Sequence, residues 1–410
     1  IIRQKRIPAG LSSVDAAQCY DRIAHAIASL VFQAFGVPEE AVQSMLESIQ
    51  DMKYFLRTAF GDSTDYASSS VQVKFQGLCQ GNGAAPAGWA VISITVLNAH
   101  KRKGHGAKFV CPISRLTGHL AAILYVDDCD LMHIDLEGQE TVHEAHEAMQ
   151  ASVVNWGQLL IATGGSLKPE KCFYHLVSFE WKVDGTWKYA KNEKDEDFQL
   201  VVPLPDGSFE QIEHASVDTV KETLGVFTCV SGKSDDANVE MAKKAQEWID
   251  NAKNGKVQRR NLWFLLDASF WPKVSYGLNC NLSSFEVLSE CLQKQWYQIL
   301  PMGGIKRSVK KGIRQLSRGF YGAGCPHPGV ECLVAQANKI MMHYGCQSSV
   351  GLKLQMSMEF LIIELGISLQ PLQESYARYG KFVTHSWLKT LWEKVDMFDF
   401  LIEVNNISLK

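Results

Sequence analysis

The amino-acid sequence predicts an α+β fold: a small antiparallel sheet with packed helices, followed by a mainly helical half. Short apolar runs bounded by turn residues precede residue 230, and Asp-Gly dipeptides at 184–185 and 206–207 mark two hairpins. After the polar linker 231–236, the apolar residues follow helical spacing. The 410 residues, 46% hydrophobic and 21% charged, suffice for two or more globular domains.

Composition bounds the class of protein and its partners. The formal net charge of -3 gives no overall attraction to nucleic acid, so such a partner needs local basic patches. Eleven cysteines without paired short spacings indicate a reduced, intracellular protein. No apolar stretch is long enough for a bilayer and no signal peptide is visible, so no membrane partner is expected. Because the sequence begins with Ile1 rather than Met, we expect a fragment or a processed product.

The elements before residue 230 alternate between helices and strands. A strand carries Asp15, and a strand–turn–strand unit carries Asp127 and Asp128. Apolar periodicity predicts helices over 23–35, 39–55, 89–99 and 140–162, and strands over 108–113 and 173–179.

The elements after residue 230 are helical. The predicted helices cover 237–254, 257–270, 283–300, 328–345, 356–365 and 372–398. We divide the chain into a sheet-containing domain over 1–230, a helical region over 231–320 and a helical extension over 321–410.

The adjacent carboxylates of Asp127 and Asp128 are the strongest candidate site. They lie between the apolar runs 120–124 and 131–134, which predicts a hairpin with its charges at the tip. Two like charges side by side repel unless a cation lies between them, and Mg²⁺ prefers such oxygen ligands. A solvated turn is the alternative, since Asp is common in turns. These residues alone leave both interpretations open.

A basic segment over 306–318 is the second candidate. It contains six cations and no acid: Lys306, Arg307, Lys310, Lys311, Arg314 and Arg318. If these cations lie on one face of a helix, that face could bind the phosphate backbone of a nucleic acid. The alternative is that the face is only exposed to solvent and binds nothing. The basic loop 101–103 is a weaker case of the same kind.

A zinc site is not expected. The candidate ligands are Cys325, His327, Cys332, His343 and Cys346. Their spacings match neither a zinc knuckle nor a zinc finger, so zinc is unlikely on these residues.

Five stretches occur in an order that resembles a known family. The first three are Asp15 with Tyr20 five positions on, Gly77-x-x-Gln80-Gly81 with Pro86, and Tyr125-Val126-Asp127-Asp128. The last two are the stretch from Gly164 to Lys171, and Leu224-Gly225. Together they resemble the palm motifs of reverse transcriptases, especially those of non-LTR (LINE-like) retrotransposons and their group II intron relatives.

The resemblance implies a right-hand polymerase palm over 1–230, a thumb-like region over 231–320 and an extension over 321–410. It implies RNA-directed DNA polymerase activity of a retroelement, with an RNA template, a DNA primer and deoxynucleoside triphosphates as partners. The implied cofactor is a pair of Mg²⁺ ions, for which Mn²⁺ can substitute. The implied compartment is the nucleus if the retroelement is eukaryotic.

The resemblance also assigns roles to residues. Asp15 and Asp127 would bridge the ions, with Asp128 as the more peripheral ligand. The substrate-binding residues would be Tyr20 as the gate against a 2′-hydroxyl, Gln80 and Gly81 along the template–nucleotide pair, and Tyr125. Lys171 would donate a proton to the leaving pyrophosphate. Instead of contacting a sugar, Tyr20 could simply pack in the core. Instead of donating a proton, Lys171 could be an ordinary exposed lysine beside a turn.

The chain departs from the family where the fingers would be. Only 14 residues precede Asp15, which leaves no room for them, so we expect residues 1–410 alone to polymerise poorly or not at all. One alternative is a viral-type RNA-dependent RNA polymerase, disfavoured by Tyr20 and by Val126, where those enzymes favour Gly. Another is a degenerate remnant that only binds nucleic acid; the intact carboxylates argue against it.

Overall fold

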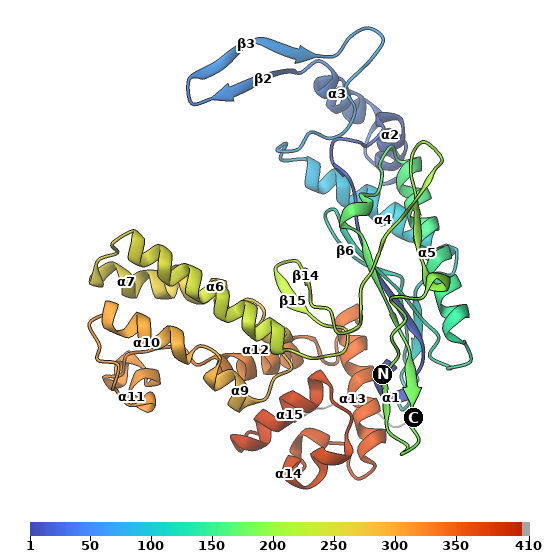
Figure 1. Cartoon of the computed structure of the whole chain (residues 1–410). Helices are drawn as coiled ribbons and strands as arrows, with labels where there is room; N and C mark the ends of the chain where they lie inside the picture. Colours follow the sequence, from blue (N-terminus) through green and yellow to red (C-terminus); the bar gives the residue numbers. More distant parts are fainter. Residues whose placement is uncertain (404–410) are drawn as a thin grey trace.

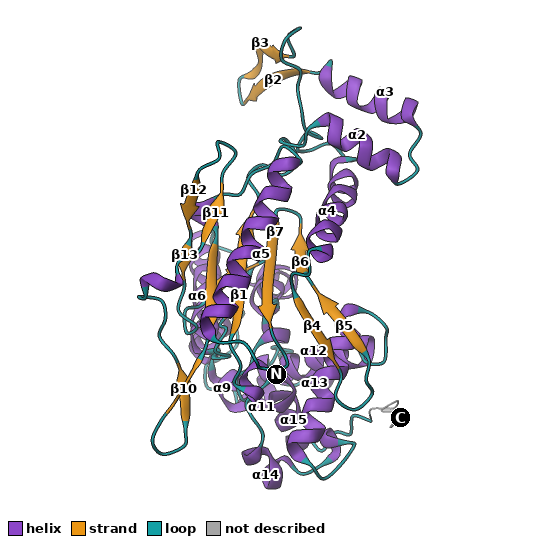
Figure 2. Ribbon diagram, turned by 90° about the vertical axis from the view of Figure 1, so that its right-hand side faces the viewer, coloured by secondary structure: helices purple, strands orange, loops and turns teal. Residues whose placement is uncertain are grey.

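A computed structural model describes residues 1–403 and confirms the α+β prediction. Its main sheet has five strands in the order β13-β8-β1-β7-β6 (Figures 1 and 2). The strands are β1 (Ala9–Asp15), β6 (Ala122–Tyr125), β7 (Asp128–Ile134), β8 (Phe173–Val177) and β13 (Glu213–His214). All neighbours are antiparallel except β13 and β8, which are parallel.

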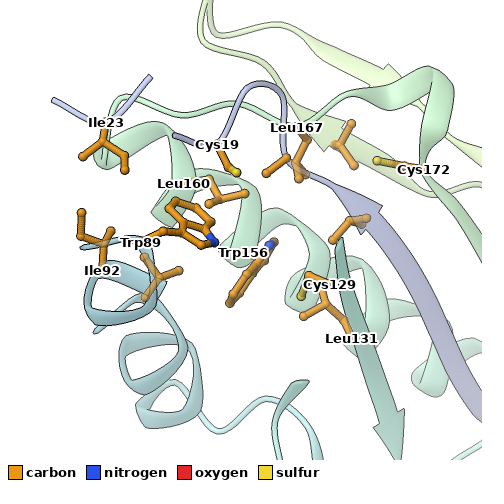
Figure 3. Packing of buried hydrophobic residues seen from close by; sticks show 14 of the residues in the cluster. Cys19, Ile23, Trp89, Ile92, Cys129, Leu131, Trp156, Leu160, Leu167 and Cys172 are labelled. Carbon is orange, nitrogen blue, oxygen red and sulfur yellow. The ribbon is translucent and has the colours of Figure 1, made fainter. Parts of the chain in front are cut away.

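Helices α4 (Ala85–Arg102) and α5 (Val142–Ala162) cover one face of this sheet (Figure 2). Cys129 and Leu131 point toward them and are buried with Trp89 of α4 and Trp156 of α5 (Figure 3). Val14 of β1 belongs to the same buried cluster. Because successive side chains of a strand point to opposite faces, the residues between these positions face away from the helices. The pleat thus separates an apolar core from a polar face.

The start and end of α5 are both fixed locally. Thr141 caps its N-terminus by accepting a hydrogen bond from the backbone of Glu144, whose side chain bonds back to Thr141. After its C-terminus, Gly164 has φ +93° and approaches the backbone oxygen of Arg22, which a Cβ would meet at 2.4 Å. A glycine is required there, and it brings the segment after α5 against the segment after β1.

The region between β1 and α4 departs from the prediction. Helices α2 (His25–Ala34) and α3 (Glu39–Gln50) form, but the predicted helix over 39–55 is wrong beyond residue 50. Residues 53–68 instead make an exposed hairpin of β2 (Lys53–Thr58) and β3 (Gly61–Ser68), at the top of Figure 1. Its aromatic residues pair across the strands rather than on a helix face.

Four further hairpins surround the main sheet. Their strands are β4 (Ala107–Val110) with β5 (Thr117–Leu120), β9 (Phe179–Trp181) with β10 (Trp187–Tyr189), β11 (Val201–Pro203) with β12 (Phe209–Gln211), and β14 (Lys221–Thr223) with β15 (Val226–Thr228). Both predicted Asp-Gly hairpins are confirmed, since residues 184–185 and 206–207 form the turns of β9–β10 and β11–β12.

The second half is helical, as predicted, but in shorter pieces. Its helices are α6 (Asp235–Asn254), α7 (Arg259–Leu265), a π-helix (Leu266–Phe270), α8 (Trp271–Ser275), α9 (Phe285–Glu290), α10 (Gln293–Met302), α11 (Lys311–Gln315), α12 (Pro328–His343), α13 (Ser349–Leu365), α14 (Tyr376–Tyr379) and α15 (Trp387–Met397). The predicted single helix over 372–398 is wrong, because an extended segment at 383–386 separates α14 from α15 and Ser386 caps the latter.

The C-terminal helices pack directly against the sheet-containing half, close to α1 (Ile2–Lys5). Glu359 of α13 is fully buried and accepts hydrogen bonds from the backbone N–H groups of Ile113 at 2.7 Å and Ser114 at 3.0 Å. Thus α13 holds the turn between β4 and β5. Within residues 1–403, no helix combines the length and apolar character needed to cross a membrane.

Candidate active site

Three aspartates lie at one end of the main sheet. Asp15 ends β1 and Asp128 begins β7, and these two residues are directly opposite in the register of the strands. Asp127 lies in the two-residue turn between β6 and β7, where its carbonyl oxygen accepts a hydrogen bond of 3.0 Å from the N–H of Ala16. Residues opposite each other in an antiparallel pair share a face, so Asp15 and Asp128 both point away from α4 and α5.

The turn beside Asp127 is strained. Val126 has φ +55°, a conformation that a β-branched residue rarely adopts and that costs on the order of 1–3 kcal/mol. The indole Nε1–H of Trp89 donates a hydrogen bond of 2.5 Å to the Val126 carbonyl, which ties the turn to helix α4. Strain of this kind persists where the surrounding structure holds it, and it is concentrated at functional sites.

Lys171 forms an ion pair with Asp15. Its Nζ lies 2.7 Å from Oδ2 of Asp15, and this bond raises the pKa of the lysine. The contact arises because the N–H of Lys168 donates to the Asp15 carbonyl at 2.9 Å and Leu167 bridges to Ala16. Residues 167–171 therefore lie along the end of β1, and the sequence had not indicated that Lys171 and Asp15 meet.

Negative charge is concentrated around Asp128. Burial raises the pKa of its carboxyl group, and the charges of Asp127, Asp15 and Asp130 raise it further, against the opposing effect of Lys171. Asp130 was missed at the sequence level. It follows Asp128 by two residues and so shares its face of β7, and that period-two spacing was the available signal.

Tyr20 lies beside the carboxylates. Its carbonyl accepts a hydrogen bond of 2.6 Å from Leu78, and its half-buried ring meets the Trp89 ring edge-on with centroids 6.5 Å apart. Burial raises the pKa of its phenol, as do the nearby groups Cys19, Asp127 and Tyr125. The structure thus brings Tyr20, Asp127 and Tyr125 together, with one side of the Tyr20 ring packed against the core.

The loop with Gln80 and Gly81 is held against the segment after β1. Gly77 has φ +84° and approaches the backbone of Asp21, where a Cβ would lie 2.5 Å from Cα. Asp21 Oδ1 accepts a hydrogen bond of 2.9 Å from the N–H of Gln80. Gln80 and Gly81 are themselves exposed, so their surfaces are free to contact a ligand.

The donor chemistry at this end of the sheet fits a divalent ion. Asp15, Asp127 and Asp128 offer hard oxygen ligands, and the raised pKa of Asp128 reflects negative charge that a cation would offset. In the conformation described for residues 1–403, no three or more His, Cys, Asp or Glu side chains are grouped so that they could hold a metal. An oxygen of Asp15 is instead bonded to Lys171.

The basic segment 306–318 is not one helix face, contrary to the prediction. Only α11 and the first residue of a 3-10 helix (Arg318–Phe320) are helical, and residues 322–325 fold back and bond to the backbone of 313–317. Arg314 is buried, and Arg318 pairs with Asp267 at 3.1 Å. The other four cations, Lys306, Arg307, Lys310 and Lys311, are exposed.

Comparison with known proteins gives little independent support. No protein-family model matches the chain. No curated protein matches it either. Among solved structures, it is similar to a telomerase from Candida albicans solved in complex with a fragment of telomeric RNA, at 12% identity and a TM-score of 0.28. The match covers 90% of this chain and 48% of the telomerase chain, so the chain spans about half the length of that protein. A TM-score this low does not establish a shared fold.

Proposed function

We propose that this chain is the polymerising part of an RNA-directed DNA polymerase that adds deoxynucleotides to a primer 3′-hydroxyl. One observation carries the proposal: Asp15 and Asp128 are opposite in register, with Asp127 in the turn beside them. Like charges held this close, on a strained turn, are costly in a protein that uses them only for stability. They suit phosphoryl transfer, in which negative charge must be offset at the reacting groups.

Asp15 and Asp127 are the proposed ligands of two Mg²⁺ ions, with Asp128 farther out. When bound, the ions would lower the pKa of the primer hydroxyl and offset the charge of the triphosphate. Lys171, already against Asp15, would then supply a proton to the leaving pyrophosphate.

Tyr20 and the loop with Gln80 and Gly81 are the proposed nucleotide contacts. Tyr20 lies near Asp127 and Tyr125, so its ring can support the sugar of a nucleotide whose phosphates face the carboxylates. We expect a ring at that place to exclude a 2′-hydroxyl. This supports selection of deoxynucleotides over ribonucleotides.

Nucleic acid would be held mainly by the helical region. Residues 253–318 contain twelve Lys and Arg residues but only three Asp and Glu residues. This region is therefore basic, although the whole chain carries a net charge of -3. Such a local excess of cations binds phosphates without reading sequence. The proposed partners are therefore an RNA template and a DNA primer, held by their backbones.

Primer extension tests the proposal. The 410-residue chain is given oligo-dT on poly-rA with Mg²⁺ or Mn²⁺, and dTTP and UTP are compared. We expect extension that is weak, as the sequence predicts for residues 1–410 alone, that uses dTTP in preference, and that is lost in Asp127→Asn. Asp184→Asn, in the exposed turn of β9–β10, is the matched control and should retain it.

Three results would contradict the proposal. Equal extension by Asp127→Asn would remove the carboxylates from the reaction. Preferential use of UTP would indicate an RNA polymerase instead. An absence of extension together with an absence of Mn²⁺ binding would leave a remnant without catalytic function.

A further inference from the structure

Arg314 is the unusual member of the basic segment 306–318. It lies in α11, next to α10 in Figure 1, and is 9% exposed, whereas the other five cations of the segment are exposed. Buried arginines are normally paired with a carboxylate, because a buried charge without a partner is costly.

Within residues 1–403, the Arg314 guanidinium has no carboxylate partner and makes no hydrogen bond. Its Nε is buried and unpartnered. Its recorded contact is the ring of Tyr297, whose centroid lies 5.5 Å from the guanidinium carbon. The nearby acid, Asp267, is bonded to Arg318 at 3.1 Å. Within residues 1–403, the Arg314 charge therefore faces an aromatic ring but no carboxylate.

Arg314 lines a small surface pocket between α9, α10 and α11. The polar residues around it are Ser289, Gln293, Lys311 and Gln315, and its apolar wall is formed by Leu292, Trp296, Cys325, Pro326 and Pro328. Lys311 is exposed and makes no ion pair within residues 1–403. The charged and polar groups of this largely apolar pocket are two cations and amide groups, with no carboxylate, and such groups suit an anion.

We infer that this pocket binds a phosphate group of a nucleic-acid backbone, with Arg314 as its buried anchor and Lys311 at its rim. The planar guanidinium offers parallel N–H groups that match two phosphate oxygens, and the bound charge satisfies the orphaned Nε. The assignment of the phosphate to nucleic acid rests on the proposed function. The anion site itself rests on the burial of Arg314 without a partner.

Thermal unfolding of the full chain tests the anion site. Inorganic phosphate and chloride are compared at equal ionic strength, for the wild type and for Arg314→Gln, Arg314→Lys and Arg378→Gln. Arg378→Gln is the matched control, because Arg378 is also an arginine over a tyrosine ring, that of Tyr379, but is exposed. Its response measures the general stabilisation of the protein by phosphate. We expect phosphate to raise the Tm of the wild type and Arg378→Gln more than that of Arg314→Gln, with Arg314→Lys between them.

Binding of a fluorescein-labelled RNA–DNA hybrid tests the nucleic-acid assignment. We expect Arg314→Gln to weaken binding about tenfold and to reduce the slope of log K against log salt by about 0.9, the value for one phosphate. Arg378→Gln should stay within about twofold of the wild type.

Each result decides a different part of the inference. An equal response of Arg314→Gln and wild type to phosphate would overturn the site. Loss of the phosphate response with unchanged hybrid binding would show a site for free phosphate and overturn the nucleic-acid assignment. Neither readout needs polymerisation, so a chain that binds the hybrid through Arg314 but extends no primer would contradict the proposed function alone.

Discussion

Asp15 and Asp128 face each other across β1 and β7, at the strand ends that meet the turn with Asp127. Like charges directly opposite destabilise a strand pair, and the charges of Asp127 and Asp15 add to burial in raising the pKa of Asp128. The sheet would be more stable with one carboxylate fewer. An external cation is the simplest reason for a protein to keep all three.

Replacement of Asp128 by asparagine should therefore stabilise the metal-free protein. We expect Asp128→Asn to raise the free energy of unfolding by about 0.5–1 kcal/mol, the usual size of a like-charge cross-strand term. The same variant should gain less stability than the wild type when Mg²⁺ is added. Urea unfolding with and without Mg²⁺ measures both effects, and Asp184→Asn is the control. A metal-free variant that is less stable than the wild type would show that the Asp128 carboxylate makes a favourable native contact.

Lys171 should affect turnover rather than nucleotide binding. We expect Lys171→Gln to lower kcat for dTTP incorporation about a hundredfold, the size of a lost general acid, with little change in KM. Lys171→Arg should keep the pair with Asp15, but a guanidinium does not release its proton, so we expect this variant to lose about as much activity as Lys171→Gln. Steady-state primer extension separates kcat from KM. An unchanged kcat in Lys171→Gln would reduce Lys171 to a structural partner of Asp15.

Tyr20 should decide which sugar is accepted. Tyr20→Val removes the ring and should raise UTP incorporation while leaving dTTP incorporation largely intact. Tyr20→Phe keeps the ring and its edge-on contact with Trp89, so it serves as the control. The ratio of UTP to dTTP incorporation on poly-rA measures how strongly Tyr20 excludes ribonucleotides. If the ratio in Tyr20→Val equals that of the wild type, Tyr20 is a core residue.

The sequence predicted the parts of the site that depend on local pattern. Apolar runs around Asp127 and Asp128 were enough to predict a hairpin, and the Asp-Gly turns were confirmed, because each is determined by neighbouring residues. The pairing of Lys171 with Asp15 joins segments far apart in the chain and depends on the end of α5. That kind of contact has no local signal.

Burial of polar groups was the other feature the sequence could not reveal. The six cations of 306–318 looked equivalent, and only the return of residues 322–325 onto α11 buries Arg314 while the others stay exposed. The exposed hairpin over 53–68 was missed for a related reason. Its aromatic residues resembled a continuing apolar helix face until their cross-strand pairing was known.

His100 should make stability depend on pH. It is fully buried, with Nδ1 2.9 Å from Asn155 Oδ1 and Nε2 3.3 Å from Ser152 Oγ, and burial lowers its pKa to about 4. In the unfolded chain its pKa is about 6.5. Between these values the unfolded state binds a proton that the folded state does not, so stability falls as pH falls from about 6.5 to about 4.

The His100 contribution to that loss should be on the order of 3 kcal/mol. His100→Gln should flatten the pH dependence across this window, whereas the exposed His143→Gln should leave it unchanged. Urea unfolding at a series of pH values gives the comparison. Parallel curves for His100→Gln and the wild type would show that His100 becomes protonated in the folded state as readily as in the unfolded one.

Calorimetric titration of the 410-residue chain with Mn²⁺ tests the central claim, that Asp15, Asp127 and Asp128 form a site for divalent ions. We expect saturable binding to the wild type and to Asp184→Asn, and binding weakened at least tenfold in Asp127→Asn and Asp15→Asn. Equal Mn²⁺ binding by the wild type and Asp127→Asn, or no binding to the wild type, would contradict it.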